Sequence, residues 1–165
     1  MSVTSVEKDP EALTLTIETE HAAPIERVWE LWQDPHLLEQ WWGPPAYPAT
    51  MVEHDLTPGG RVRYYMTGPE DVKHYGWWRI ESIDEPHRIE FTNGLAGDDG
   101  EPVPGVQPMG GVVTFERIGS ATRMTVLTQF VDTEQMEKMI EGSMEQGMSQ
   151  AIGQIDALLE LVHAA

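Results

Sequence analysis

The chain has 165 residues, of which 40% are hydrophobic and 23% charged, and its formal net charge is -18. This length suits a single domain with a sizeable core, which we expect at residues 12–165 after a polar, flexible segment at residues 1–11. No apolar run approaches the roughly 20 residues of a membrane span. The acidic balance argues against nucleic acids and anionic membranes as partners, because both require a positive surface. The absence of cysteine and of a signal-peptide pattern favours the cytoplasm.

The first predicted elements are one strand and two short helices. Leu13 to Glu20 alternates apolar with polar side chains, which is the period of a strand with one buried face. Pro24 to Gln33 carries apolar residues at helical spacing behind a proline that the first helical turn tolerates. A second helix is expected from Pro35, and Gly43-Pro44-Pro45 ends it.

A meander of about six strands is expected next, because short alternating runs are separated by turn sequences. The runs cover approximately residues 47–56, 61–67, 74–83, 88–93, 113–117 and 124–130. Strands joined by short turns pair antiparallel. The segment from Gly94 to Gly111 differs, because it is rich in glycine and proline, carries an acidic tip and lacks periodicity. We expect a mobile hairpin connection there.

The last element is predicted as one long helix from Thr133 to Ala165. Apolar side chains follow each other at steps of three or four residues, the period of a helix with one buried face. They are Met136, Ile140, Met144, Met148, Ala151, Ile155, Leu158 or Leu159, and Val162. Gly142, Gly147 and Gly153 interrupt the pattern, each at a cost of roughly 1 kcal/mol relative to alanine. They indicate either close backbone approach or space left open.

Several short motifs occur in order between residues 12 and 161. They include Ala23-Pro24-Ile25-Glu26-Arg27-Val28-Trp29, Trp41-Trp42-Gly43-Pro44, Asp55-Leu56-Thr57-Pro58-Gly59-Gly60, Asp84-Glu85-Pro86-His87-Arg88-Ile89, Val113-Thr114-Phe115-Glu116 and Thr122-Arg123-Met124. Together they resemble the START-like, birch-pollen-allergen-like superfamily (SRPBCC). Within it they are most similar to the branch named after the activator of the 90-kDa heat-shock protein ATPase.

The resemblance implies an α+β helix-grip fold. In that fold a curved antiparallel sheet of six to seven strands, two short helices and the long C-terminal helix enclose a cavity. Members of the superfamily carry small hydrophobic or amphipathic ligands, and some are cyclases or hydrolases. We therefore expect Met144, Gly147 and Met148 to lie mid-helix over the pocket, with the 94–111 loop beside its entrance.

Inward aromatic and methionine side chains would converge on this cavity together with a few polar groups, the usual form of a small-ligand site. The expected ligand-binding residues are Trp41, Trp42, His54, Tyr64, Met66, Trp78, Phe91, Asn93, Met109, Phe115, Met144, Gly147 and Met148. Among them, His54, Tyr64 and Asn93 could orient a polar group of the ligand. Plain core packing is the alternative for each residue.

The sequence indicates no metal, no cofactor and no catalytic nucleophile. The six histidines lack metal-ligand spacing, and Ser143 lacks the strand-to-helix elbow of serine hydrolases. The leading hypothesis is a monomer or homodimer whose partner is a small hydrophobic molecule, bound in the internal cavity. Two alternatives stay open: a cyclase- or hydrolase-type enzyme acting on an aromatic or polyketide-like substrate, and a co-chaperone-like interaction module.

Overall fold

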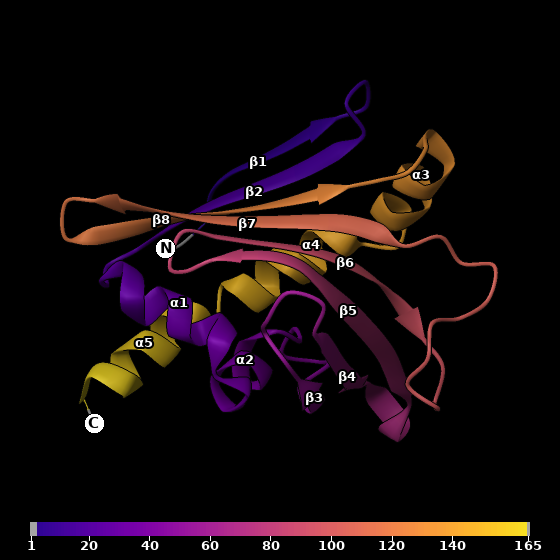
Figure 1. Cartoon of the computed structure of the whole chain (residues 1–165), viewed down its shortest axis with the longest axis horizontal. Helices are drawn as coiled ribbons and strands as arrows, with labels where there is room; N and C mark the ends of the chain where they lie inside the picture. The colour runs from indigo at the N-terminus through magenta and orange to yellow at the C-terminus, as the bar shows by residue number, and fades with distance from the viewer. Residues whose placement is uncertain (1–2, 165) are drawn as a thin grey trace.

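One curved sheet of eight antiparallel strands organises the chain, as a computed structural model shows for residues 3–164 and for the side chains of residues 3–160 (Figure 1). The strands lie side by side in the order β1-β2-β8-β7-β6-β5-β4-β3. Their bounds are β1 Val3–Asp9, β2 Thr14–His21, β3 Ala49–His54, β4 Arg61–Thr67, β5 Lys73–Asp84, β6 Arg88–Ala96, β7 Met109–Ile118 and β8 Ala121–Gln129.

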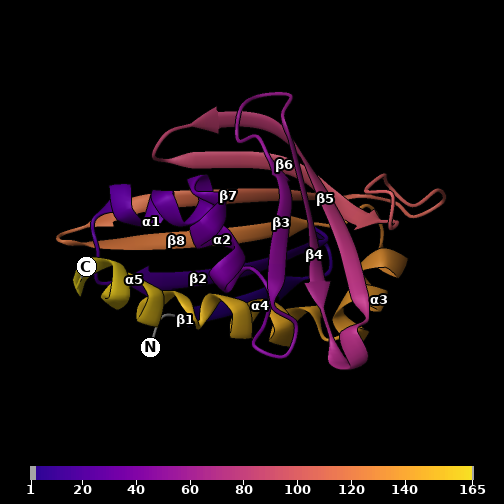
Figure 2. The same cartoon turned by 90° about the horizontal axis from the view of Figure 1, so that it is seen from below.

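The helices lie on one side of this sheet. They are α1 Ile25–Gln33, α2 Pro35–Trp41, α3 Thr133–Glu141, α4 Met144–Ile152 and α5 Ile155–Ala164. A single 3-10 turn, η1 Pro69–Asp71, lies in the connection between β4 and β5. Figure 2 shows α3, α4 and α5 running end to end across the face that the curved sheet encloses, with α1 and α2 beside α5. The α+β helix-grip fold is therefore confirmed, with eight strands where six to seven were expected. Among residues 3–164, no helix is long and apolar enough to cross a membrane.

The additional strand is β1, which lies in the segment that we expected to be flexible. β1 pairs antiparallel with β2 at one edge of the sheet, and Val3 and Val6 pack against the core. Lys8 Nζ lies 2.9 Å from Glu145 Oε1, so β1 also contacts α4. An edge strand that is mostly polar shows little apolar alternation, and periodicity alone therefore misses it.

The expected single C-terminal helix is wrong in its continuity, because it is divided into three. Asp132 caps its first turn by accepting a hydrogen bond from the Gln135 amide at 2.8 Å. The first break follows Gly142, where Ser143 adopts a left-handed conformation with φ 67°. The second break is a turn at Gly153. Two short turns let the helical segments follow the curved sheet, which a straight helix of this length could not do.

The loop expected at Gly94 to Gly111 is shorter, because β6 continues to Ala96 and β7 begins at Met109. Both glycines lie inside strands to make room for rings rather than to turn the chain. A Cβ on Gly94 would lie 3.1 Å from the Trp77 ring, and one on Gly111 would lie 2.6 Å from the Phe91 ring. β6 and β7 pair as a hairpin, which confirms that part of the expectation, and the mobility of the loop stays a prediction.

The main core lies between the sheet and α1, α2, α4 and α5. Its largest fully buried side chains include Trp32, Trp41 and Trp78. A smaller cluster at the other end of the sheet joins α3 to β2 and β7 through Met136, Leu15 and Met109. The two short helices between β2 and β3 thus place indole rings against the middle of the sheet, beneath α4.

We expect Val6→Ala to lower the free energy of unfolding by about 1 kcal/mol, because this half-buried side chain loses methyl contacts with both core clusters. Urea denaturation followed by circular dichroism measures the change. Glu7→Ala is the matched control, since the neighbouring side chain is exposed, and its effect should stay within about 0.5 kcal/mol. Equal stability of Val6→Ala and the native protein would contradict a packed β1.

Candidate functional site

A cavity of about 210 Å³ opens between α4 and the tryptophans of the α1–α2 segment. We call it the tryptophan cavity. It is lined by Trp32, Trp41, Trp42, Pro44, Met66, Val126, Met144, Gly147, Met148, Ala151 and Ile152. Among the side chains that the structure describes, those lining the cavity are all apolar, so the site offers shape and dispersion contacts rather than charge.

The wall opposite α4 is an array of indole rings in edge-to-face contact. The ring of Trp32 lies 4.9 Å from that of Trp41 and 5.8 Å from that of Trp42, measured between centroids. Such contacts fix the rings relative to one another. Trp41 Nε1 donates to the Leu31 carbonyl at 3.0 Å, and Trp32 Nε1 donates to Met124 Sδ at 3.3 Å. These two polar N–H groups are therefore satisfied by the protein itself.

The second wall of the tryptophan cavity is one face of α4. Met144, Gly147, Met148 and Ala151 are spaced by three, one and three residues, which places them on the same side of a helix. The turn after α4 is held against the end of α2, because Gln154 Nε2 donates to the Gly43 carbonyl at 2.8 Å and to the Trp41 carbonyl at 3.3 Å. This side chain sets the position of α4 relative to the tryptophans.

Six of the thirteen sequence-predicted residues lie around the cavity. They are Trp41, Trp42, Met66, Met144, Gly147 and Met148. Met144, Gly147 and Met148 all line the cavity from α4, but Met144 is the first residue of this short helix and does not lie mid-helix. Whether these residues bind a ligand stays a prediction.

The other seven predicted residues pack or bond elsewhere. His54 Nε2 lies 2.9 Å from the Trp32 carbonyl, and Asn93 Nδ2 donates to the Met109 carbonyl at 3.2 Å. The remaining five are Tyr64, Trp78, Phe91, Met109 and Phe115, which belong to the core clusters or pack against them. Phe91 stacks on Trp78 with 4.6 Å between the ring centroids, and both rings are part of the main core.

Five lining residues were not among the predicted ligand-binding set. They are Trp32, Pro44, Val126, Ala151 and Ile152. Ala151 was already part of the helical stripe, and Val126 lies in the strand expected at residues 124–130, so a choice based on facing positions rather than on side-chain size could have found both. Trp32 could not be placed from sequence, because its ring reaches the cavity only through the angle between α1 and the sheet.

Tyr64 supports the cavity from behind Trp42, whose ring centroid is 6.0 Å away. Burial raises the pKa of the Tyr64 phenol, and the indole N–H groups of Trp42 and Trp78 lower it in part, so the phenol is neutral at physiological pH. Neither indole nitrogen forms a hydrogen bond of good geometry. Gly76 makes this packing possible, because a Cβ there would lie 2.4 Å from the Tyr64 hydroxyl.

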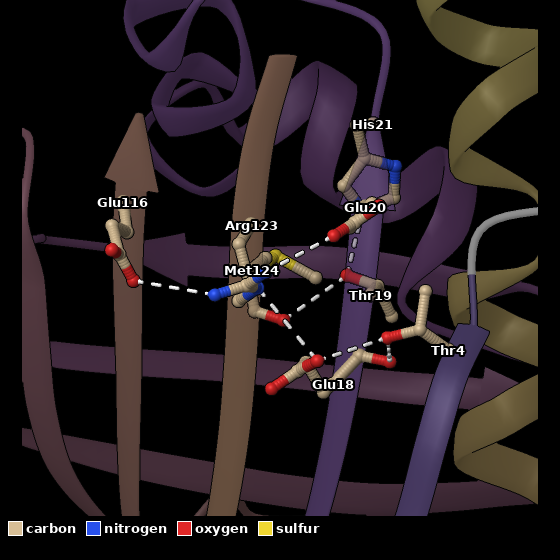
Figure 3. A network of polar contacts seen from close by, with 8 residues as sticks. All are labelled: Thr4, Glu18, Thr19, Glu20, His21, Glu116, Arg123 and Met124. Atoms are coloured by element: carbon tan, nitrogen blue, oxygen red, sulfur yellow. Dashed lines mark hydrogen bonds and ion pairs between the residues drawn. The ribbon is translucent and has the colours of Figure 1, made fainter. Parts of the chain in front are cut away.

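A larger groove of about 600 Å³ lies beside the first part of α5, and we call it the His21 groove. Its lining is Glu20, His21, Ala22, Ala23, Pro24, Arg27, Ala121, Asp156, Leu159 and Glu160. The His21 ring is fully buried beneath it, with Nδ1 3.0 Å from Asp156 Oδ1 on α5 and Nε2 2.9 Å from Thr19 Oγ1. Thr19 also donates to the Met124 carbonyl at 3.2 Å (Figure 3). Both ring nitrogens are engaged, so His21 joins β2 to α5 rather than serving as a free acid or base.

We expect His21→Ala to lower the free energy of unfolding by about 2 kcal/mol, because it leaves Thr19 and Asp156 without their shared partner. Asp156→Asn should cost clearly less, since an amide oxygen still accepts a hydrogen bond from Nδ1. Thermal and urea unfolding measure both variants. Equal stability of His21→Ala and the native protein would show that the imidazole does not hold α5.

A curved antiparallel sheet that grips C-terminal helices around an apolar cavity defines a START-like protein of the helix-grip class. Within this class, the family model described as "Activator of Hsp90 ATPase homolog 1-like protein" matches residues 22–160. The chain belongs to that family.

Solved structures agree with this assignment. The crystal structure of a Mycobacterium smegmatis protein is 45% identical, with a TM-score of 0.89, and the match covers 98% of this chain and 99% of that chain. The solution structure of an Arthrobacter aurescens protein is 46% identical, with a TM-score of 0.92, and the match covers 96% of this chain and 92% of that chain. A Staphylococcus epidermidis protein at 24% identity and a TM-score of 0.84, covering 96% and 94%, shares the fold. No curated protein matches the chain.

Proposed function

We propose that the protein binds a small, uncharged, aromatic or otherwise apolar molecule in the tryptophan cavity. The observation that carries this proposal is the lining, which combines three indole rings, three methionine thioethers and small aliphatic groups. Indole rings favour flat aromatic partners in offset or edge-to-face contact. Thioethers make favourable contacts with aromatic rings and adapt to their outline. The lining therefore suits a planar ring system better than a flexible polar molecule.

The volume limits the size of the ligand. An apolar cavity of about 150 Å³ in another protein binds benzene. A cavity of about 210 Å³ therefore suits a molecule somewhat larger than benzene, such as a fused two-ring system. Parts of a longer ligand could extend through the open mouth of the cavity.

Charge on the ligand opposes binding for two reasons. An ionised group entering an apolar lining loses its hydration without gaining a partner. The net charge of -18 adds a repulsive field for anions. The preferred ligand is therefore neutral, and a carboxylate of the same size should be discriminated against.

Binding is better supported than catalysis. A cyclase or hydrolase needs an acid or base within hydrogen-bond reach of its substrate. The polar candidates His54 and Asn93 do not line the cavity and lie within hydrogen-bond distance of backbone carbonyls, and Tyr64 packs behind Trp42. The co-chaperone alternative rests on the name of the family alone.

We expect naphthalene to bind the native protein in isothermal titration calorimetry, and 2-naphthoate to bind at least about tenfold more weakly, because its carboxylate would be desolvated. Ala151→Leu should abolish naphthalene binding by filling the cavity. Gln150→Leu is the matched control, since the neighbouring side chain on α4 is exposed, and it should bind as the native protein does. Absence of naphthalene binding to the native protein, or undiminished binding to Ala151→Leu, would refute the proposal.

A further inference from the structure

We infer that Gly147 determines the size of ligand that the tryptophan cavity accepts, an inference that rests on the proposed ligand-binding function. Gly147 lies in the middle of α4 and lines the cavity. Its amide donates to the Ser143 carbonyl at 2.9 Å, the ordinary bond of an α-helix. Glycine is the least favourable residue at such a position after proline, so its presence there requires a reason.

Neither backbone conformation nor crowding supplies that reason. The Gly147 backbone is helical and does not need the left-handed region that favours glycine. A Cβ at this position would meet only Pro44 Cγ at 3.9 Å, which is ordinary van der Waals contact. Gly142 and Gly153, which follow α3 and α4, differ, because a Cβ on Gly142 would lie 3.3 Å from the Lys138 carbonyl and one on Gly153 would lie 3.2 Å from the Ser149 carbonyl.

The space in front of Gly147 is part of the cavity. Pro44, which a Cβ at position 147 would contact, is itself a lining residue. A side chain at position 147 would therefore project between the two walls of the cavity. Met144 and Met148 flank the glycine on the same face and can change rotamer to follow a ligand. A methyl group fixed to the helix backbone could not move away. The unsubstituted position therefore sets the depth of the cavity, and the methionines adjust its outline.

The inference predicts that stability and binding change in opposite directions. Gly147→Ala should raise the melting temperature by about 2 to 4 °C, because alanine favours the helix and meets no clash. The same variant should bind naphthalene at least tenfold more weakly and toluene within threefold of the native protein, since only the larger ring system needs the space. Gly147→Leu should bind neither molecule. Differential scanning fluorimetry and calorimetric titration with both probes measure these effects.

Gln146→Gly is the matched control for helix stability, because it changes an exposed neighbour on α4. It should lower the melting temperature and leave both affinities unchanged. Unaltered naphthalene binding by Gly147→Ala, or an equal loss of naphthalene binding in Gly147→Ala and Gln146→Gly, would overturn the role of Gly147 while the proposed function stood. A native protein that binds neither probe would overturn both.

Discussion

The burial of one side chain, Trp32, holds the parts of this fold together. Its aromatic neighbours are Trp41, Trp42, Trp78 and Phe115, at centroid distances between 4.9 and 6.4 Å. Its indole N–H donates to Met124 on β8, and its carbonyl lies within hydrogen-bond distance of His54 on β3. A residue of α1 thereby contacts α2 and strands from both halves of the sheet. The position of the cavity wall follows from this packing, because the adjacent indole rings have no freedom to fill the space beneath α4.

The two walls of the tryptophan cavity differ in stiffness. On one side, interlocked indoles are backed by Tyr64, and Gly76 leaves that ring the room it needs. On the other side, α4 is a nine-residue helix bounded by turns, with methionines on its inner face. Contacts from outside hold it in place: Lys8 of β1 pairs with Glu145, and Gln154 bonds to the end of α2. A rigid aromatic surface facing an adaptable thioether surface suits one class of ring-shaped ligand whose members vary in outline.

Sequence periodicity predicted what depends on local spacing. The helical stripe placed Met144 and Met148 on one face, and alternation placed Trp78 and Phe91 on inward strand faces. It could not reveal that Trp78 and Phe91 stack on each other in the core instead of lining the cavity, because that depends on long-range packing. The polar edge strand β1 gave too weak a pattern, and the left-handed turn at Ser143 has no sequence signal beyond the glycine before it. The sequence-based prediction therefore failed for long-range packing and for the edge strand of the sheet. In both, contacts with residues distant in the sequence decide the structure, and periodicity does not.

The space inside the tryptophan cavity lowers the stability of the folded protein, and contacts elsewhere in the fold offset this loss. An empty apolar cavity lowers the free energy of unfolding by about 24 cal/mol per Å³. A volume of about 210 Å³ therefore corresponds to ~5 kcal/mol, which is an upper limit because the cavity has an open mouth. Domains of this kind have net stabilities of only about 5 to 15 kcal/mol. A larger residue at position 147 would reduce this cost and would also stabilise the helix α4. The chain nevertheless carries glycine at this position. A ligand that occupies the space restores the missing contacts and adds its binding free energy to the stability of the folded state. Ligand binding and stability are therefore coupled at α4, because both depend on how the space between Gly147 and Pro44 is filled.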